Sequence, residues 1–326
     1  MPCHGLIMRI TGPTIRVMND THFEASSPTP AEKASPNESR IDRERAVALA
    51  PAVSAPMLEI VDETASTNTD LMQRMKALPR ERAVAGVHVV RAAYRQTAGR
   101  GRQGRSWQAE PGHALMFSVG CIVPRPLSGL AGLSLAVGAA LVERLRTLPG
   151  LAAADAERIS LKWPNDVLLD GGKLAGILVE TAWSTAVATA AVIGVGINVR
   201  SDPALDAELA AAAAALPEQA RPTPPAALSQ ILPGADLTLT LAASLAGLSA
   251  MIDTFSKEGF AAFRPRWSAC HAYAGREVVL LERGEPFARG TALGVDDAGQ
   301  LLLDTADGVR AIATGDVSLR LAPSTP

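Results

Sequence analysis

The sequence has little cysteine: its 326 residues include only Cys3, Cys121 and Cys270, which lie far apart. An odd number of widely separated thiols argues against a disulfide framework, and their spacing matches no zinc-binding motif. The five histidines follow no metal-ligand or catalytic-triad spacing either. We therefore expect free thiols in a reducing compartment and no metal bound by cysteine or histidine.

Long apolar runs are also missing. We find no uninterrupted run of the roughly 18 apolar residues that a membrane span needs, and residues 1–20 lack the apolar segment of a secretory signal. The net charge is only −2, with basic residues concentrated around Arg100, whereas a nucleic-acid-binding domain is usually basic throughout. These absences predict a cytoplasmic protein without membrane or DNA partners, and the basic patch suits a small anionic ligand.

The most distinctive stretch runs from residue 95 to residue 107 and reads Arg-Gln-Thr-Ala-Gly-Arg-Gly-Arg-Gln-Gly-Arg-Ser-Trp. Glycine lets the backbone approach a ligand closely, and successive free N–H groups form an anion-binding concavity. Arginine adds planar donors for phosphate or carboxylate. The Gly-Lys-Ser/Thr ending of a P-loop is absent. This Gly/Arg loop is interpreted as a lid over a polyanion, although a solvated surface turn would show the same pattern.

Further motifs stand at characteristic positions around this loop. They are Ser66-Thr67-Asn68, Lys162-Trp163-Pro164-Asn165-Asp166, the run Gly-Gly-Lys-Leu-Ala-Gly-Ile-Leu-Val-Glu at 171–180, and Gly194-Val195-Gly196-Ile197-Asn198. In this order and spacing the set resembles the biotin protein ligases, over roughly residues 57–322. Several independent motifs agree, which makes the resemblance specific.

Hydrophobic patterning predicts an α+β fold with a mixed sheet, because antiparallel hairpins alternate with occasional helices. We expect helices at 70–78, 130–148 and 239–266, and strands at 58–61, 83–93, 114–123, 158–163, 167–169, 174–181 and 186–194, the last ending in a Gly-x-Gly turn. From residue 275 onward, five short strands separated by turns predict a small barrel, SH3-like in the family that the chain resembles.

Three parts follow from this reading. Residues 1–56 are rich in proline and polar residues and are expected to be a disordered extension, although 41–50 could form one or two helical turns and 6–17 a strand. Residues 57–272 form the catalytic domain, with an Ala/Pro-rich insertion at about 204–235, and 273–326 form the barrel. The extension does not provide the winged helix-turn-helix that some family members carry; a true start near Met57 is the alternative.

The resemblance implies a two-step reaction. The carboxylate of biotin would be joined to AMP from ATP, with Mg²⁺ and release of pyrophosphate. The biotinyl group would then pass to a lysine of a biotin carboxyl carrier protein, such as that of acetyl-CoA carboxylase. Family members include monomers and homodimers, so the oligomeric state stays open.

The resemblance also implies roles for individual residues. Catalysis falls to Lys173, Arg102 and Asp166, and Asp166 is also the Mg²⁺ ligand. The biotin set is Ser66, Thr67, Asn68, Gln96, Arg100, Gly101, Arg102 and Lys173. The ATP or adenylate set is Arg100, Arg102, Arg105, Trp107, Lys162, Asn165, Asp166 and Asn198.

Plainer interpretations remain beside these. Ser66-Thr67-Asn68 could only cap a helix, and Lys162 could be a surface cation. Two other functions also remain: a relative that transfers lipoate or octanoate, and a biotin-sensing repressor, which the missing DNA-binding module disfavours. The sequence assigns no base to the transfer step: Asp166 is one candidate, and the proximity of a reactive mixed anhydride is the alternative.

Overall fold

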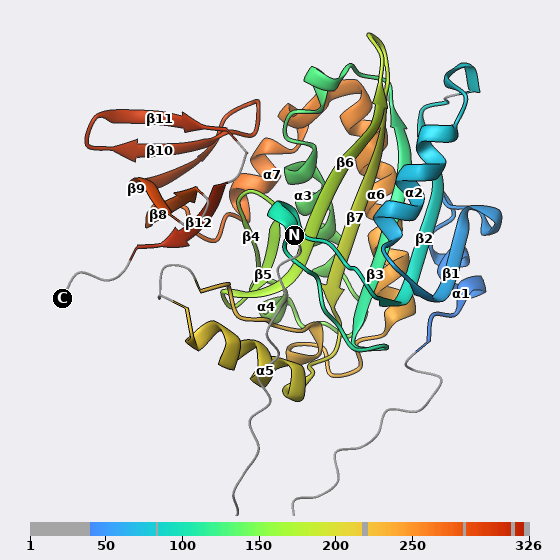
Figure 1. Ribbon diagram of the computed structural model, residues 1–326, viewed down its shortest axis with the longest axis horizontal. Helices are drawn as coiled ribbons and strands as arrows, with labels where there is room; N and C mark the ends of the chain where they lie inside the picture. The colour runs from blue at the N-terminus through green and yellow to red at the C-terminus, as the bar shows by residue number, and fades with distance from the viewer. Residues whose placement is uncertain (1–39, 83, 217–220, 283–284, 314–316, 323–326) are drawn as a thin grey trace, which may run out of the picture. The chain divides into compact units, whose positions relative to one another are not determined.

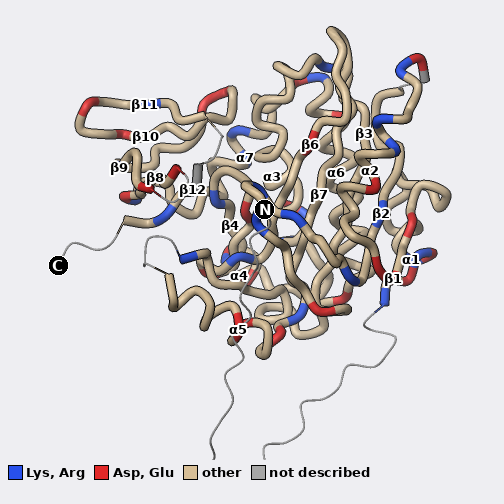
Figure 2. The backbone as a smooth tube through the Cα atoms, in the orientation of Figure 1, with Lys and Arg blue, Asp and Glu red and all other residues tan. Residues whose placement is uncertain are grey.

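The computed structural model describes residues 40–82, 84–216, 221–282, 285–313 and 317–322 (Figure 1). The strand proposed within residues 6–17 lies outside these ranges. Within them, a large sheet with its helices is followed along the chain by a small second sheet, as the sequence predicts. Figure 2 shows Lys and Arg interspersed with Asp and Glu along the chain, in agreement with the small net charge.

The large sheet has seven strands in the order β1-β2-β3-β7-β6-β5-β4. Only β1 and β2 pair in parallel, and the other pairs are antiparallel, so the predicted mixed sheet is confirmed. The strands are β1 (Leu58–Thr64), β2 (Gly86–Gln96), β3 (Ala114–Val123), β4 (Ile159–Lys162), β5 (Asp166–Leu169), β6 (Gly172–Ser184) and β7 (Thr189–Asn198).

Helices cover both faces of this sheet, which is why all ten residues of β3 are buried. One face packs against α3 (Leu133–Leu145) and α6 (Leu237–Glu258), and the other against α2 (Thr67–Ala77). The remaining helices are α1 (Arg43–Leu49), α4 (Ala153–Ala156), α5 (Pro203–Ala214) and α7 (Arg264–Ala269). Alternate residues of β3 therefore enter two separate apolar clusters.

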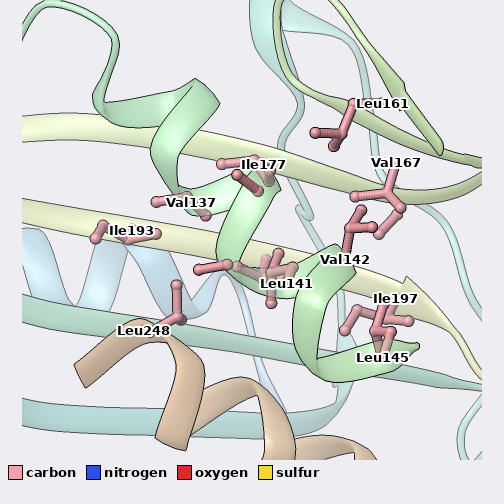
Figure 3. Packing of buried hydrophobic residues seen from close by; sticks show 14 of the residues in the cluster. Val137, Leu141, Val142, Leu145, Leu161, Val167, Ile177, Ile193, Ile197 and Leu248 are labelled. Atoms are coloured by element: carbon pink, nitrogen blue, oxygen red, sulfur yellow. The ribbon is translucent and has the colours of Figure 1, made fainter. Parts of the chain in front are cut away.

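Helix α3 is buried almost all round: ten of its 13 residues are buried, and Glu143 and Arg144 are the exposed ones. Its side chains contact the sheet on one side and α6 on the other, as Val137, Leu141 and Leu248 illustrate (Figure 3). The single helix expected at 239–266 is divided, because Gly259 takes a positive φ of 70° and ends α6. A short turn then leads into α7.

Two helical stretches, Leu127–Leu145 and Leu237–Ala262, are long and apolar enough to cross a membrane, which our reading of the sequence missed. Their most apolar windows are 50% and 61% buried inside the fold. Both stretches supply core side chains, as the packing of α3 and α6 requires.

Residues 40–56 are part of the fold, so the prediction that the extension is disordered up to residue 56 is wrong. The proposed helical turns form α1, which Asp42 caps by accepting from the Arg45 N–H. Ala46 is fully buried, and the Asp42 N–H donates to the hydroxyl of Thr238 on α6 at 2.9 Å. The same contacts argue against a folded domain that begins at Met57.

The second sheet has five antiparallel strands in the order β11-β10-β9-β8-β12, as expected for an SH3-like barrel. They are β8 (Glu277–Glu282), β9 (Glu285–Val295), β10 (Leu301–Thr305), β11 (Gly308–Ile312) and β12 (Val317–Leu321). The indole of Trp163 donates to the carbonyl of Gly299 at 3.1 Å, which links this sheet to the end of β4.

Removal of α1 should destabilise the protein. We expect a chain that begins at residue 57 to be less stable than one that begins at residue 40, by about 2 kcal/mol or more. It loses buried apolar area, the Ile41 N–H bond to the Tyr94 hydroxyl and the Asp42 N–H bond to Thr238. Urea unfolding of the two chains measures the difference. Ala46→Asp should also destabilise the protein, and Ala52→Asp at an exposed position is the matched control; equal stability of the two point variants would contradict the packing of α1.

Candidate functional site

One cavity of about 570 Å³ gathers all the residues that the sequence assigned to a ligand. They come from α2, the Gly/Arg loop and four strands or strand ends, and are Ser66, Thr67, Asn68, Gln96, Arg100, Gly101, Arg102, Arg105, Trp107, Lys162, Asn165, Asp166, Lys173 and Asn198. The Gly/Arg loop forms a wall of this cavity, with Gly101, Arg102 and Trp107 half-buried, whereas Gln103–Ser106 are exposed to solvent as in a surface turn.

The N-terminus of α2 forms the polar end of the cavity. Ser66 caps the helix by accepting from the Thr69 N–H, so the interpretation of this motif as a helix cap is confirmed. The Thr67 N–H donates to the side-chain oxygen of Gln96 at 2.8 Å. Three consecutive buried polar residues are thus both a cap and a lining of the cavity.

A buried hydroxyl that the sequence analysis missed completes this polar end. Ser118 on β3 is fully buried, and its Oγ lies 2.7 Å from the Thr67 hydroxyl and 2.6 Å from the amide oxygen of Asn68. The Asn68 Nδ2 then donates to the carboxylate of Glu180 at 2.8 Å. The signal for Ser118 is its position: it is the polar residue in an otherwise apolar buried strand.

The Gly-x-Gly motif lies inside β7, so the predicted turn at this position is wrong. A Cβ on Gly194 would lie 2.2 Å from the Asn68 amide oxygen, and one on Gly196 would lie 2.5 Å from the Trp107 ring. Gly176, the neighbour of Gly196 on β6, also lies beneath Trp107. These positions lack side chains because an amide and an indole lie against the sheet there.

At the other end of the cavity, two lysines share one carboxylate. The Lys173 ammonium is 2.8 Å from Asp166 Oδ1, and the Lys162 ammonium is 3.4 Å from Oδ2. Lys162 also donates to the hydroxyl of Thr223 at 2.6 Å. Its side chain is only 4% exposed, which rules out the surface-cation interpretation.

Burial and charge set the pKa values of this cluster. Burial lowers the pKa of Lys162 to about 8, although Asp166 opposes the shift. Burial alone would raise the pKa of Asp166, but the charges of Lys173 and Lys162 hold it below its usual range. The carboxylate is therefore ionised at neutral pH, and the cluster carries a net positive charge.

The Gly/Arg loop is folded back on itself. The Gly101 N–H donates to the Arg105 carbonyl at 2.7 Å, and the Trp107 N–H donates to the Gly99 carbonyl at 3.0 Å. A Cβ on Gly99 would lie 2.5 Å from the Trp107 carbonyl oxygen, so this position requires glycine. The Arg102 guanidinium donates to the side-chain oxygen of Asn165 at 3.3 Å, which connects the loop to the end of β4.

The Ala/Pro-rich segment is more ordered than the loose insertion we predicted. Helix α5 lines the cavity, and the residues that follow pair with the start of β6: the Lys173 N–H donates to the Pro224 carbonyl at 2.7 Å. Additional basic side chains that the sequence analysis missed also line the cavity: Arg200, Arg221 and Arg320. Burial lowers the pKa of Arg320, and nearby Arg105 adds to the shift.

The predicted Mg²⁺ ligand does not fit a resident metal. Both oxygens of Asp166 face lysine ammonium groups, and a divalent cation would have to displace them. Among the residues that the structure describes, no group of three or more His, Cys, Asp or Glu side chains could hold a metal ion. Asp166 is instead the counter-ion of two lysines.

Comparison with known proteins gives consistent matches over most of the chain. The model of the biotin/lipoate A/B protein ligase family matches residues 64–198, and that of the biotin protein ligase C terminal domain matches residues 273–320. The biotin–[acetyl-CoA-carboxylase] ligase of Paracoccus denitrificans is 37% identical over 231 residues, which cover 69% of this chain and 88% of that protein. The ligase of the same name from Mycobacterium tuberculosis is 33% identical over 270 residues, which cover 80% of this chain and 88% of that protein.

Comparison of the fold with solved structures also matches biotin protein ligases. The solved biotin protein ligase from Aquifex aeolicus in complex with biotin and ATP aligns with a TM-score of 0.62 at 28% identity, covering 81% of this chain and 99% of that one. The matches extend over both sheets.

The shared carboxylate makes a stability prediction. Asp166→Asn leaves Lys162 buried without its counter-ion and should destabilise the protein by about 3 kcal/mol at pH 7. Because the folded-state pKa of Asp166 is lowered, its contribution is present above the unfolded value of about 3.9 and is lost as the pH falls through the folded value.

Urea unfolding of wild type and variant at pH 7 and pH 3 measures this dependence. The difference should shrink at the lower pH. Asp62→Asn, which removes a carboxylate from an exposed ion pair, is the control. An Asp166→Asn variant as stable as wild type at pH 7 would contradict the assigned role.

Proposed function

Because this chain belongs to the biotin protein ligase family, we propose that it activates biotin as biotinyl-5'-AMP and then transfers the biotinyl group to a lysine of a biotin carboxyl carrier domain. The family assignment makes the chain a ligase. Acetyl-CoA carboxylase, which the relatives' names give as the target, supplies the expected carrier.

The observation that carries this proposal is the distribution of chemistry within one cavity. Uncharged donors and acceptors lie at the α2 end, where an uncharged ureido ring would find paired partners. The Lys173–Asp166–Lys162 cluster lies at the other end, where phosphates would need positive charge. The Gly/Arg loop lies along both parts. An acyl-adenylate has this polarity: an uncharged ring, a central phosphate and a nucleoside.

The first step needs no base, because a carboxylate is already ionised at neutral pH. A biotin oxygen attacks the α-phosphorus of ATP, the bond to the bridging oxygen breaks, and pyrophosphate leaves. We assign Lys173 and Arg102 to bring the two anions together and to neutralise the charge on the phosphate. Asp166 is a positioning residue that orients both lysines, and Lys162 adds a buried positive charge.

The remaining residues bind and orient the substrates. Ser66, Thr67, Asn68 and Gln96 are assigned to the ring of biotin, and Trp107, Asn165 and Asn198 to the nucleotide part. Asn198 also donates to the Lys173 carbonyl at 3.1 Å, so it fixes the backbone that carries this lysine.

In the second step, the neutral amine of the carrier lysine attacks the acyl carbon of the adenylate. The bond from that carbon to the phosphate oxygen breaks, AMP leaves with the electron pair, and the new amide loses a proton to solvent. The mixed anhydride is reactive enough that proximity of the amine can carry this step.

ATP–pyrophosphate exchange tests the proposal. We expect exchange that depends on biotin and not on lipoate or octanoate; exchange with lipoate alone would eliminate the biotin assignment. Lys173→Ala should lower the exchange rate by roughly 100-fold or more, because it removes charge stabilisation in the transition state. Lys76→Ala, at an exposed position on α2, is the matched control. Wild-type exchange in Lys173→Ala would refute the role of this lysine.

The lowered pKa of Lys162 predicts a pH dependence. If its charge helps to hold the phosphates, exchange should decline above about pH 8, the value at which Lys162 loses its proton. Lys162→Arg keeps its positive charge at high pH, so in this variant the exchange rate should begin to decline only at a higher pH. Rates measured from pH 6 to pH 10 give both profiles; the same alkaline decline in both proteins would assign it to another group.

A further inference from the structure

Glu180, on β6, connects the polar end of the cavity to the Gly/Arg loop. Its Oε2 accepts from the Arg100 guanidinium at 2.7 Å and from the Asn68 amide at 2.8 Å. The side chain is one quarter exposed, while that of Arg100 is 44% exposed. Two donors from different elements therefore meet on one carboxylate oxygen.

Asn68 is held from several sides, so it fixes where the Glu180 carboxylate can lie. Its amide oxygen faces Ser118, its Nδ2 also donates to the Leu178 carbonyl at 3.3 Å, and Gly194 leaves space for it against the sheet. The position of Glu180 is thus set from the polar end of the cavity.

The Gly/Arg loop also separates two cavities. Residues 100–103 line both the cavity already described and a second one of about 660 Å³, whose other walls come from β6, the start of α3 and the turn at 298–300. Glu180 lines the second cavity, as does Arg100. The Arg100–Glu180 ion pair therefore fastens the loop to β6 where the loop divides the two spaces.

We propose that Glu180 is a positioning residue that holds the Gly/Arg loop closed over the acyl-adenylate. The proposal rests on the proposed function. Arg100 acts through this ion pair, so its assignment to phosphate and biotin contacts is replaced by a role in loop closure. A ligand lying against Asn68 restrains the amide and hence the carboxylate, so filling of the biotin pocket strengthens the attachment of the loop.

Release of the bound intermediate tests this role directly. Glu180→Gln should release preformed biotinyl-AMP roughly tenfold faster, because a charge-assisted bond becomes a neutral one. The same loss should increase labelling of free lysine by escaped adenylate. Glu63→Gln removes the carboxylate from the exposed Arg95–Glu63 pair near the same loop and is the matched control; release should be unchanged there.

A double-mutant cycle separates loop closure from a merely structural role. If Glu180 acts through Arg100, the Arg100→Met/Glu180→Gln protein should release the adenylate no faster than Arg100→Met alone. Additive effects would mean that Glu180 acts through Asn68 only and would overturn the proposal. Unchanged release in Glu180→Gln would overturn it as well.

Salt gives an independent measurement. The ion pair is partly exposed, so release from the wild type should accelerate between 0.05 and 0.5 M salt, and Arg100→Met should lose this dependence. Because the Arg100 side chain is exposed, Arg100→Met should fold even if Glu180→Gln does not, and the test stays valid. If Arg100→Met kept the salt dependence of the wild type, the role of the Arg100–Glu180 ion pair in loop closure would be contradicted. A wild-type protein that makes no biotinyl-AMP would refute the proposed function itself.

Discussion

The site depends on the charge balance between two lysines, Lys162 and Lys173, and the buried carboxylate of Asp166. Lys162 lies almost entirely out of water, and a lone ammonium group there would be strongly disfavoured. Asp166 compensates it and at the same time holds Lys173, so one carboxylate sets the positions of two cations. The three charges sum to +1, which keeps an attraction for anions in the cavity. Loss of the carboxylate would change the fold and the chemistry together.

The fold places these charged groups at the ends of neighbouring strands, beside glycines on which other side chains pack. Lys162 ends β4, Asp166 begins β5 and Lys173 lies near the start of β6, so the hairpin geometry of neighbouring antiparallel strands brings them together. On the adjacent strands, glycines let Asn68 and Trp107 lie against the sheet. The polar side chains at the start of α2 and the lysine ammonium groups thus line one cavity.

Much of this could be predicted from the sequence, because the motifs are local. The mixed sheet and the approximate positions of its strands follow from alternation and turn residues, whereas the expectation that the motif residues share one site came from the family resemblance. Features that depend on distant partners were missed. Ser118 and Glu180 become meaningful only when β3, β6 and α2 lie together, and α1 is ordered by contacts with α6 that its own proline-rich surroundings do not reveal. The glycines of β7 were interpreted as a turn, because the sequence alone does not distinguish a glycine needed for a turn from one needed to make room for a neighbouring side chain.

The bond from the Trp163 indole to the Gly299 carbonyl has a mechanical consequence. Trp163 directly follows Lys162, so the small sheet is attached beside the buried lysine. Any tilt of the five-stranded sheet against the larger one must either break this bond or pull on the end of β4. The C-terminal module is therefore mechanically coupled to the strand end that carries Lys162.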